Sequence, residues 1–412
     1  MWRRVCLLLV LAGCWSDDPL VDGELTAAQL AHLRTDMQAG PLDPCDLGSN
    51  GSGGPSVLPQ DKCDAAALLG QMLFFDVRLS DEGIGSGTGY VATEGTGKVS
   101  CGSCHDPNGY FIDTRMPNNV SLGQTKLTKR NAMTVLDLEL KESVAPAFTW
   151  EGTFPTPGSV LTLALKKAMS ASTDNIAYWI KKDALYLSLY RQAFGSRDVY
   201  ESAELALAAY FFRLEGTSPF DAYIAGSDSA ISDDAKRGFG VFVGRGTCIE
   251  CHSGPTLGDF VPRNTGVAQG SAIDPGAGSD DGNPADIGAF ATPTLRNIAM
   301  TAPYMHNGSL PSLDTVIDFY RRGGDSLEYP GTRDPKIQPL DLSDDDVRDL
   351  AAFLQTLTDA PVDKQYRAAL CSTGTNVGLL CSDGCKDAAN DKNNCGACGN
   401  VCQNACMGGT CL

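Results

Sequence analysis

The sequence contains the segment Cys101-Gly102-Ser103-Cys104-His105, whose pattern returns as Cys248-Ile249-Glu250-Cys251-His252. In a C-x-x-C-H segment, the two thiols reach the two vinyl groups of one haem and the adjacent histidine ligates the iron. A redox dithiol and half of a zinc site are the alternatives. Two complete copies in a chain with only four histidines favour two covalently bound haem c groups. The run Cys395-Gly396-Ala397-Cys398 is followed by Gly399 and therefore predicts no third haem.

The composition is acidic. Asp and Glu number 50 against 32 Lys and Arg, which gives a formal net charge of −18 over 412 residues. This charge excludes a nucleic-acid partner, because phosphate binding needs a basic face. It also predicts that a docking protein brings a basic surface. The length allows two or three domains, each with its own hydrophobic core.

The first residues indicate export. Two arginines precede the apolar run 5–11, which is too short to span a bilayer. The run ends in Leu11-Ala12-Gly13-Cys14, which resembles a bacterial lipobox. We expect residues 1–13 to be a signal peptide and Cys14 to carry lipid, with an ordinary cleaved signal as the alternative. The protein is then exported and periplasmic, and held to a membrane face, or displayed at the cell surface, only by a lipid anchor.

The remaining cysteines indicate disulfides. Cys45 and Cys63 are a candidate pair across a Gly/Ser/Pro-rich loop. Eight more follow position 370: Cys371, Cys381, Cys385, Cys395, Cys398, Cys402, Cys406 and Cys411. An even number in an exported chain predicts disulfide bonds, and the sequence leaves their connectivity open.

Helical periodicity dominates between these features, and strand alternation is scarce. Amphipathic segments are expected at 65–75, 159–169, 176–194, 201–214, 232–243 and 343–357. In the last segment, Ser343 can cap the helix together with Asp346. The predicted fold is mainly α, with two cytochrome c-type haem domains and a small disulfide-rich C-terminal tail. The predicted parts are a tether at 14–62, an N-terminal haem domain at 63–230, a C-terminal haem domain at 231–360 and the tail at 361–412.

Several runs around the two motifs resemble the bacterial dihaem cytochrome c peroxidase and MauG family, over residues 64–360. They are Leu69-Gly70-Gln71-Met72-Leu73-Phe74-Phe75-Asp76, Arg130-Asn131-Ala132-Met133-Thr134, Trp150-Glu151-Gly152, Thr292-Pro293-Thr294-Leu295-Arg296-Asn297 and Thr301-Ala302-Pro303-Tyr304-Met305-His306. The resemblance implies a cytochrome-c peroxidase-type oxidoreductase. It would reduce hydrogen peroxide at the N-terminal haem, with electrons passed through the C-terminal haem. The implied donor is a small periplasmic cytochrome or cupredoxin, and a homodimer is a candidate assembly.

The histidine count bears on the first haem. Typical members of this family have a second, distal histidine on that haem. Here no histidine lies between His105 and His252, and the two others are His32 and His306. We therefore expect His105 to hold a five-coordinate iron with an open distal face.

We expect His252 to hold the second iron. The other ligand of this iron is inferred from the position that supplies it in the family. In typical members a methionine ligates fourteen residues after the motif histidine that corresponds to His306. That position is Tyr320 here, which resembles MauG-type enzymes whose phenolate ligates iron. Met300, Met305 and an open site are the alternatives.

Two other functions stay open. A MauG-like enzyme would oxidise a protein side chain or an organic substrate with peroxide. Tyr320 and the missing distal histidine favour it, whereas the absence of a tryptophan at 124–129 opposes a close copy of it. A pure electron-transfer cytochrome would need two six-coordinate irons, for which four histidines are too few.

Three further residues have expected roles, and two of these roles are implied by the resemblance. Thr301 and Pro303 match positions whose carbonyl groups hold a calcium ion. Glu151 is the candidate for acid–base work at the distal face, with a solvated turn carboxylate as the alternative reading.

Overall fold

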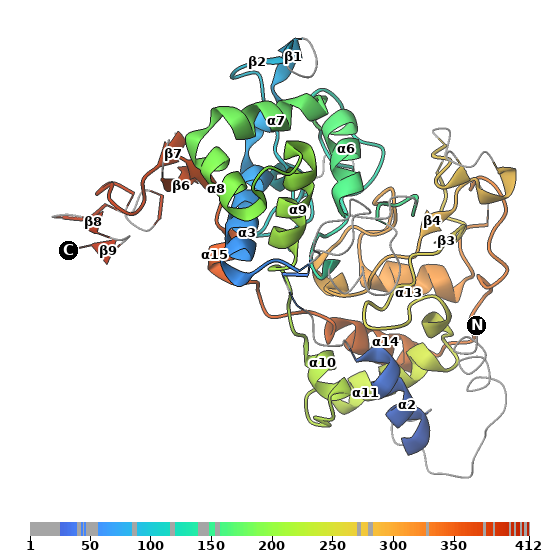
Figure 1. The fold of residues 1–412 in the computed structure, drawn as a ribbon. Helices are drawn as coiled ribbons and strands as arrows, with labels where there is room; N and C mark the ends of the chain where they lie inside the picture. Colours follow the sequence, from blue (N-terminus) through green and yellow to red (C-terminus); the bar gives the residue numbers. More distant parts are fainter. Residues whose placement is uncertain are drawn as a thin grey trace. The chain divides into compact units, whose positions relative to one another are not determined.

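The computed structural model describes residues 25–38, 43, 45–46, 57–84, 89–115, 120–138, 148–152, 157–269, 273–278, 283–326, 329–373, 376–381, 384–394, 397–398, 401–403, 406–407 and 410–411. The chain divides into two compact units, each with one C-x-x-C-H motif. The His105 unit comprises Asp43–Glu139, Pro155–Glu215 and Val362–Leu412. The His252 unit comprises Met1–Leu42, Leu140–Phe154 and Gly216–Pro361. The described residues are mainly helical, as the sequence predicted (Figure 1).

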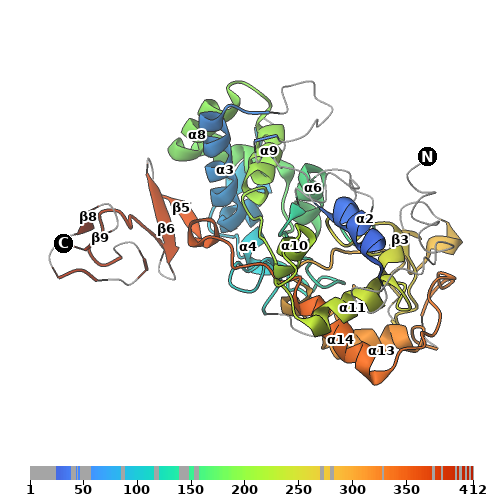
Figure 2. The same ribbon diagram turned by 90° about the horizontal axis from the view of Figure 1, so that it is seen from below.

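The His105 unit is built on a bundle of helices. Its elements are α3 (Gln60–Phe75), η1 (Val77–Ser80), β1 (Glu82–Ile84), β2 (Val91–Thr93), α4 (Cys101–Cys104), α6 (Pro157–Lys167), α7 (Thr173–Lys182), α8 (Ala184–Phe194), α9 (Val199–Phe211) and α15 (Lys364–Arg367). Helix α3 packs between α8 and α9 (Figure 2). Gly70 allows the closest approach, because a Cβ there would lie 1.9 Å from the carbonyl oxygen of Ala206 on α9.

The His252 unit is also built on helices, two of which pack closely at a glycine. Its elements are α2 (Ala27–Met37), α10 (Pro219–Ile224), α11 (Asp233–Val243), η4 (Cys248–Glu250), β3 (Pro262–Arg263), η5 (Pro284–Asp286), β4 (Phe290–Ala291), η6 (Ile298–Met300), α13 (Leu313–Arg321) and α14 (Asp344–Gln355). Helices α11 and α14 cross at Gly238, where a Cβ would lie 1.9 Å from the carbonyl oxygen of Asp349. The buried rings of Phe220, Phe239 and Phe353 form the centre of this core, with centroids 5.1 to 5.3 Å apart.

Local capping explains where the helices begin and end. Ser343 caps α14 and forms a capping box with Asp346, as predicted. The single helix expected at 176–194 is wrong, because the chain breaks into α7 and α8 at Asp183. The Asp183 backbone is extended, and its carboxylate accepts from the amides of Leu185 and Tyr186 at 3.1 and 3.3 Å.

The two units differ in extent from the segments expected from the sequence. Helix α2 lies within the expected tether, and it buries Leu30, Leu33 and Met37 in the core of the His252 unit. Helix α10 precedes residue 231 and yet belongs to the same core, because Phe220 packs on α11 and α14. Both segments belong to the His252 unit because their apolar side chains are buried in its core. A boundary drawn from composition does not take such burial into account.

Disulfides stabilise the ends of the His105 unit. Cys45 and Cys63 are bonded, as expected. The tail contains a sheet of β5 (Leu370–Ser372), β6 (Val377–Cys381) and β7 (Gly384–Lys386), followed by the hairpin of β8 (Cys406–Met407) and β9 (Thr410–Cys411). The described tail disulfides are Cys371–Cys385, Cys381–Cys398 and Cys402–Cys411. Cys395 lies outside the described residues.

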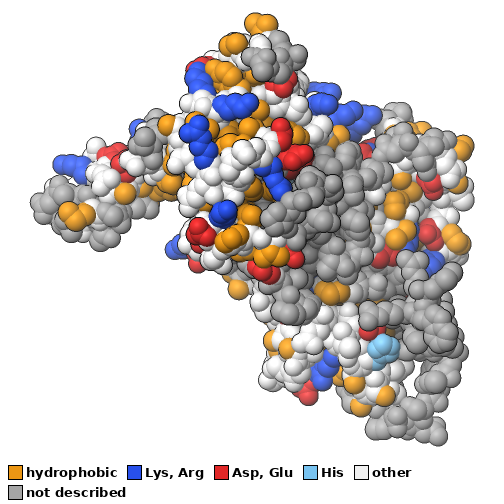
Figure 3. Space-filling view, viewed as in Figure 1, with side chains coloured by type: hydrophobic (Ala, Val, Ile, Leu, Met, Phe, Trp, Pro, Cys, Tyr) orange, Lys and Arg blue, Asp and Glu red, His pale blue; other side chains and the backbone are white. Residues whose placement is uncertain are grey.

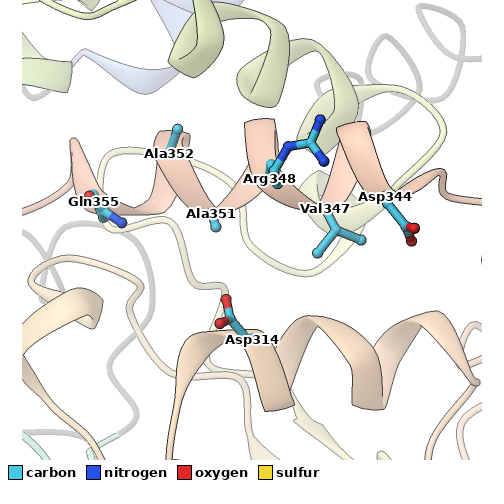
Figure 4. A pocket seen from close by; sticks show the side chains of 7 residues that line it. All are labelled: Asp314, Asp344, Val347, Arg348, Ala351, Ala352 and Gln355. Carbon is cyan, nitrogen blue, oxygen red and sulfur yellow. The ribbon is translucent and has the colours of Figure 1, made fainter.

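Two features of the surface complete the description. Within the described part of the chain, no helix has both the length and the apolar character needed to cross a membrane. A hollow of about 450 Å³ lies between α13 and α14, with Asp314, Arg348 and Gln355 among the side chains that line it (Figure 4). None of the cysteines or histidines of the two motifs lines this hollow.

Candidate functional site

The first motif forms one short helical turn. Ser100 caps α4, and the amide of His105 donates to the carbonyl oxygen of Cys101 at 2.9 Å. The turn places both thiols and the imidazole around one short segment of backbone. Nδ1 of His105 lies 3.1 Å from the carbonyl oxygen of Phe111. This contact fixes the ring orientation and leaves Nε2 for an iron ion.

The second motif has the same construction. The amide of His252 donates to the carbonyl oxygen of Cys248 at 2.8 Å. Nδ1 of His252 lies 3.0 Å from the carbonyl oxygen of Leu257. Burial lowers the pKa of both motif histidines, so each imidazole is neutral at pH 7, as an iron ligand must be.

The four motif thiols fit covalent haem attachment. Cys101, Cys104, Cys248 and Cys251 are all unbridged, whereas Cys45, Cys63 and six described cysteines of the tail form disulfides. Burial raises the pKa of Cys101 and of Cys248 to about 12. A redox dithiol needs the opposite shift, since its reactive form is the thiolate. The donor set therefore fits two haem c groups and not a dithiol pair.

An aromatic cluster lies beside His105, and the sequence analysis gave its members no role. The ring of Phe74 lies 6.5 Å from the imidazole of His105, 6.1 Å from Phe111 and 5.3 Å from Tyr210. All three aromatic residues are almost fully buried. Phe74 belongs to a run quoted for its family resemblance, so the sequence contained its signal. Tyr210 could be located only through the packing of α9 on α3.

An arginine lies beside the outer thiol of each motif. Nη2 of Arg115 lies 3.3 Å from Sγ of Cys104, and the Arg115 guanidinium pairs with the buried carboxylate of Asp113. In the His252 unit, Arg263 pairs with Asp259 at 2.6 Å and interacts electrostatically with Cys251. In each unit, an aspartate shortly after the motif is followed within four residues by the arginine that pairs with it. The sequence analysis did not use this signal.

Tyr320 lies close to the second motif. Burial raises the pKa of its phenol well above the usual value, and the charges of Cys251 and Cys248 raise it further. The phenol therefore interacts electrostatically with both thiols of this motif. Of the two alternative methionines, Met300 on η6 is 46% exposed, and Met305 is half-buried with a left-handed backbone.

The two histidines outside the motifs lie in the His252 unit. His306 is buried and stacks on Phe290 with ring centroids 3.7 Å apart, and Trp150 meets it edge-on. His32 is partly exposed on α2 and lies 3.3 Å from a carboxylate oxygen of Asp36. Both have neighbours of their own within that unit.

The roles predicted for Glu151, Thr301 and Pro303 remain predictions. Glu151 is half-buried in a turn whose preceding residue, Trp150, accepts a hydrogen bond from Ala291 on β4. Thr301 and Pro303 are half-buried beside η6, and a calcium site at their carbonyl groups stays an expectation. The described residues contain no cluster of three His, Cys, Asp or Glu side chains suited to a metal ion. Cys14 lies outside the described residues.

Comparison with known proteins places these motifs in context. A family model described as di-haem cytochrome c peroxidase matches residues 64–229, and one described as RoxA-like, cytochrome c-like matches residues 289–323. The methylamine utilization protein MauG of Methylorubrum extorquens is 33% identical over 319 residues, which cover 74% of this chain and 83% of the relative. The cytochrome-c peroxidase IdrP2 of Denitromonas iodatirespirans is 30% identical over 341 residues, with coverages of 74% and 85%. A crystal structure of a MauG-like protein associated with microbial copper homeostasis is 28% identical, with a TM-score of 0.64 over 81% of this chain and 97% of that one.

Proposed function

The chain belongs to the di-haem cytochrome c peroxidase family, and from this premise we propose that it reduces hydrogen peroxide at the His105 haem. Electrons would pass through the His252 haem from a small exported cytochrome or cupredoxin. The balance is one peroxide, two protons and two electrons to two molecules of water. The protein is thus an oxidoreductase, and the donor and the route of the electrons are the proposed part.

The observation that carries the proposal is the supply of histidines. The chain has four, two of them in the motifs. The other two, His32 and His306, have neighbours of their own within the His252 unit. The distal face opposite His105 then has no histidine to displace, and peroxide can reach it without prior reduction of the protein.

The residues around His105 prepare the site in three ways. The contact of Nδ1 with the carbonyl oxygen of Phe111 orients the imidazole and makes it a stronger ligand for iron. The buried rings of Phe74, Phe111 and Tyr210 form an apolar cluster beside His105 that would exclude water from this side chain. A bound haem would supply the iron that binds peroxide and accepts its oxidising equivalents.

The proposal is tested by adding a small excess of hydrogen peroxide to the fully ferric holoprotein and following the Soret band by stopped flow. A shift within milliseconds supports an open site at His105. A band that changes only after the second haem has been reduced would mean that the site opens on reduction, and would overturn the proposal. The variant Glu151→Gln tests the acid–base role, because it should slow this shift if Glu151 moves a proton there.

We further propose that Tyr320 ligates the second iron, as its position beside Cys251 and Cys248 supports. An anionic oxygen ligand lowers the reduction potential relative to methionine. Tyr320→Met should therefore raise the potential of the second haem and change its low-spin spectrum. Phe319→Leu on the same helix is the matched control. An unchanged potential and spectrum in Tyr320→Met would remove this residue from the coordination sphere.

The same ligand favours a second candidate function, which is MauG-like oxidation of a protein side chain or an organic substrate. A phenolate ligand stabilises the oxidised states of iron, and so suits an enzyme that stores oxidising equivalents. This function predicts a rapid peroxide-dependent spectral change without efficient oxidation of a reduced cytochrome or cupredoxin.

Two accessory features complete the proposal. A calcium ion at the carbonyl groups of Thr301 and Pro303 would make peroxide turnover sensitive to a calcium chelator, and added calcium would restore it. A lipid on Cys14 would keep the exported protein in the membrane fraction, and Cys14→Ser would release it.

A further inference from the structure

A small hairpin with exposed leucines borders the first haem motif. Leu122 and Leu127 pair in an antiparallel bridge, and the two residues are 42% and 41% exposed. The carbonyl oxygen of Leu122 lies 3.2 Å from Nη2 of Arg115 and 3.9 Å from Sγ of Cys104. Because Cys104 is an expected point of haem attachment, this hairpin lies beside the first haem site.

Exposed lysines surround the hairpin. They are Lys98, Lys126, Lys129, Lys166 and Lys167. Backbone contacts bring their three segments together. The amide of Gln124 donates to the carbonyl oxygen of Ala168 at 2.9 Å, directly after α6, and Oε1 of Gln124 accepts from the amide of Lys98 at 3.3 Å. Blue side chains gather beside α6 in the space-filling view (Figure 3).

No ion pair with a described residue neutralises the charge of these lysines. Within the described residues, none of the five forms an ion pair. Some other cations of the same unit are paired, such as Arg78 with Asp76 and Lys182 with Glu94, whereas the described Lys62 and Arg191 form no ion pair. In a chain of net charge −18, five unpaired lysines around two exposed leucines form a local basic surface. A small apolar centre with a charged rim is the composition of a protein docking site.

We propose that this basic hairpin surface, Lys98, Leu122, Lys126, Leu127, Lys129, Lys166 and Lys167, docks a redox protein with an acidic face. The docked protein gives electrons to the first haem across the Cys104 edge. The inference rests on the proposed function and adds to it a partner of defined charge and a second point of electron entry. Two one-electron donors are oxidised for each peroxide, which takes up two protons to give two waters.

The test compares two double charge reversals of equal size. Lys126→Glu with Lys167→Glu alters the basic hairpin surface. Lys62→Glu with Arg191→Glu is the matched control, because both residues are exposed at the other end of α3, where Gln192 contacts the carbonyl oxygen of Asp61. The sixteen residues of α3 separate the two ends by about 24 Å.

Binding of a reduced acidic cupredoxin to each holoprotein is measured by calorimetry at low and at high salt. The hairpin variant should bind at least about tenfold more weakly at low salt and lose most of the salt dependence, because the lost attraction is screened charge. The control variant should bind within about twofold of the wild type. Equal affinity for both variants, or binding that does not respond to salt, would overturn the docking proposal.

A second assay separates this proposal from the proposed function. Peroxide-dependent oxidation of a small neutral phenol needs no docking site and should be equal in all three proteins. The rate with the acidic cupredoxin should fall only in the hairpin variant. Phenol turnover with an unaffected cupredoxin rate would overturn the docking surface alone. An absence of phenol turnover in the wild type would count against the peroxidase itself, and the calorimetry would still decide the docking surface.

Discussion

Replacing Arg296 with methionine should destabilise the His252 unit and disturb its haem ligand. The Arg296 side chain is 5% exposed. Its guanidinium donates to the two carboxylate oxygens of Asp221 at 2.7 and 3.0 Å, and Nε donates to the carbonyl oxygen of Pro255 at 2.8 Å. The segment that contains Pro255 also contains Leu257, whose carbonyl oxygen orients His252. One side chain thus connects helix α10 to the loop behind the second iron ligand.

The magnitude follows from the partners left behind. Removing one member of a buried, hydrogen-bonded pair costs about 3–5 kcal/mol. The Asp221 side chain keeps 27% exposure, so water can solvate part of the stranded carboxylate. We therefore expect the low end, about 3 kcal/mol. Asp221→Asn should cost much less in the Arg296→Met background than in the wild type, because the pair is already broken.

The assay is guanidinium unfolding of the holoprotein, followed by far-UV circular dichroism and by the absorbance of the second haem. With a denaturant slope of about 4 kcal/mol per molar, the midpoint of the His252 unit should fall by about 0.7 M. Arg237→Met is the control, since Arg237 makes exposed ion pairs with Asp234 and Asp349 and its loss should leave the midpoint nearly unchanged.

The same pair predicts a pH dependence. Burial disfavours the ionised form of Asp221, but the hydrogen bonds and charge of Arg296 prevail and lower its pKa below the ordinary value. A lowered folded pKa stabilises the protein above the unfolded pKa of about 4, and this stability is lost as the pH falls through the folded value. The difference between wild type and Arg296→Met should therefore narrow below about pH 4. An equal difference at pH 7 and pH 3, or a midpoint shift no larger than that of Arg237→Met, would refute the reasoning.

Three further predictions concern packing and the tail. Gly238→Ala should cost about 1–3 kcal/mol in denaturant unfolding, because its Cβ would meet the carbonyl oxygen of Asp349, and a smaller cost would mean that α11 and α14 can separate freely. Gln71→Leu should cost about 1–2 kcal/mol and expose the segment before β5 to proteolysis, because the buried Gln71 amide donates to two carbonyl groups of that segment; unchanged proteolysis would contradict this. Loss of the Cys371–Cys385 disulfide, with a sequence separation of 14, should destabilise the tail by about 3 kcal/mol, and tail protection from protease equal to wild type would show that β5 and β6 hold without it.

Local chemistry made much of the fold predictable. The cap at Ser343 and the apolar face behind it gave α14 its boundaries, because both signals lie within one helix. The break at Asp183 was missed, although aspartate favours a cap, because the apolar period continues across it. Helix α2 was missed since its apolar residues gain stability only from the core of the His252 unit, which a local window does not contain.

The candidate site divides in the same way. The motif cysteines and histidines were predictable because haem attachment imposes a fixed local spacing. The carbonyl contacts that orient His105 and His252, and the approach of Tyr320 to the second motif, depend on segments five to seventy residues away. Disulfide connectivity was open for the same reason, since it depends on which strands of the tail pair.

Net charge alone does not locate a docking surface. A total of −18 predicts a basic partner, whereas the residues around Cys104 present unpaired lysines. A sum over the chain does not show how charge is distributed, and association depends on the local field at the docking surface. The acidic and basic predictions can both hold if different partners use different faces.

The most direct test of the central claim is the initial rate of peroxide-dependent oxidation of ferrous cytochrome c by the fully ferric protein, with no pre-reduction. Immediate turnover without a lag is expected, because no histidine has to leave the distal face of the His105 haem. A lag that disappears after pre-reduction, or no turnover while peroxide leaves the haem bands unchanged, would contradict it.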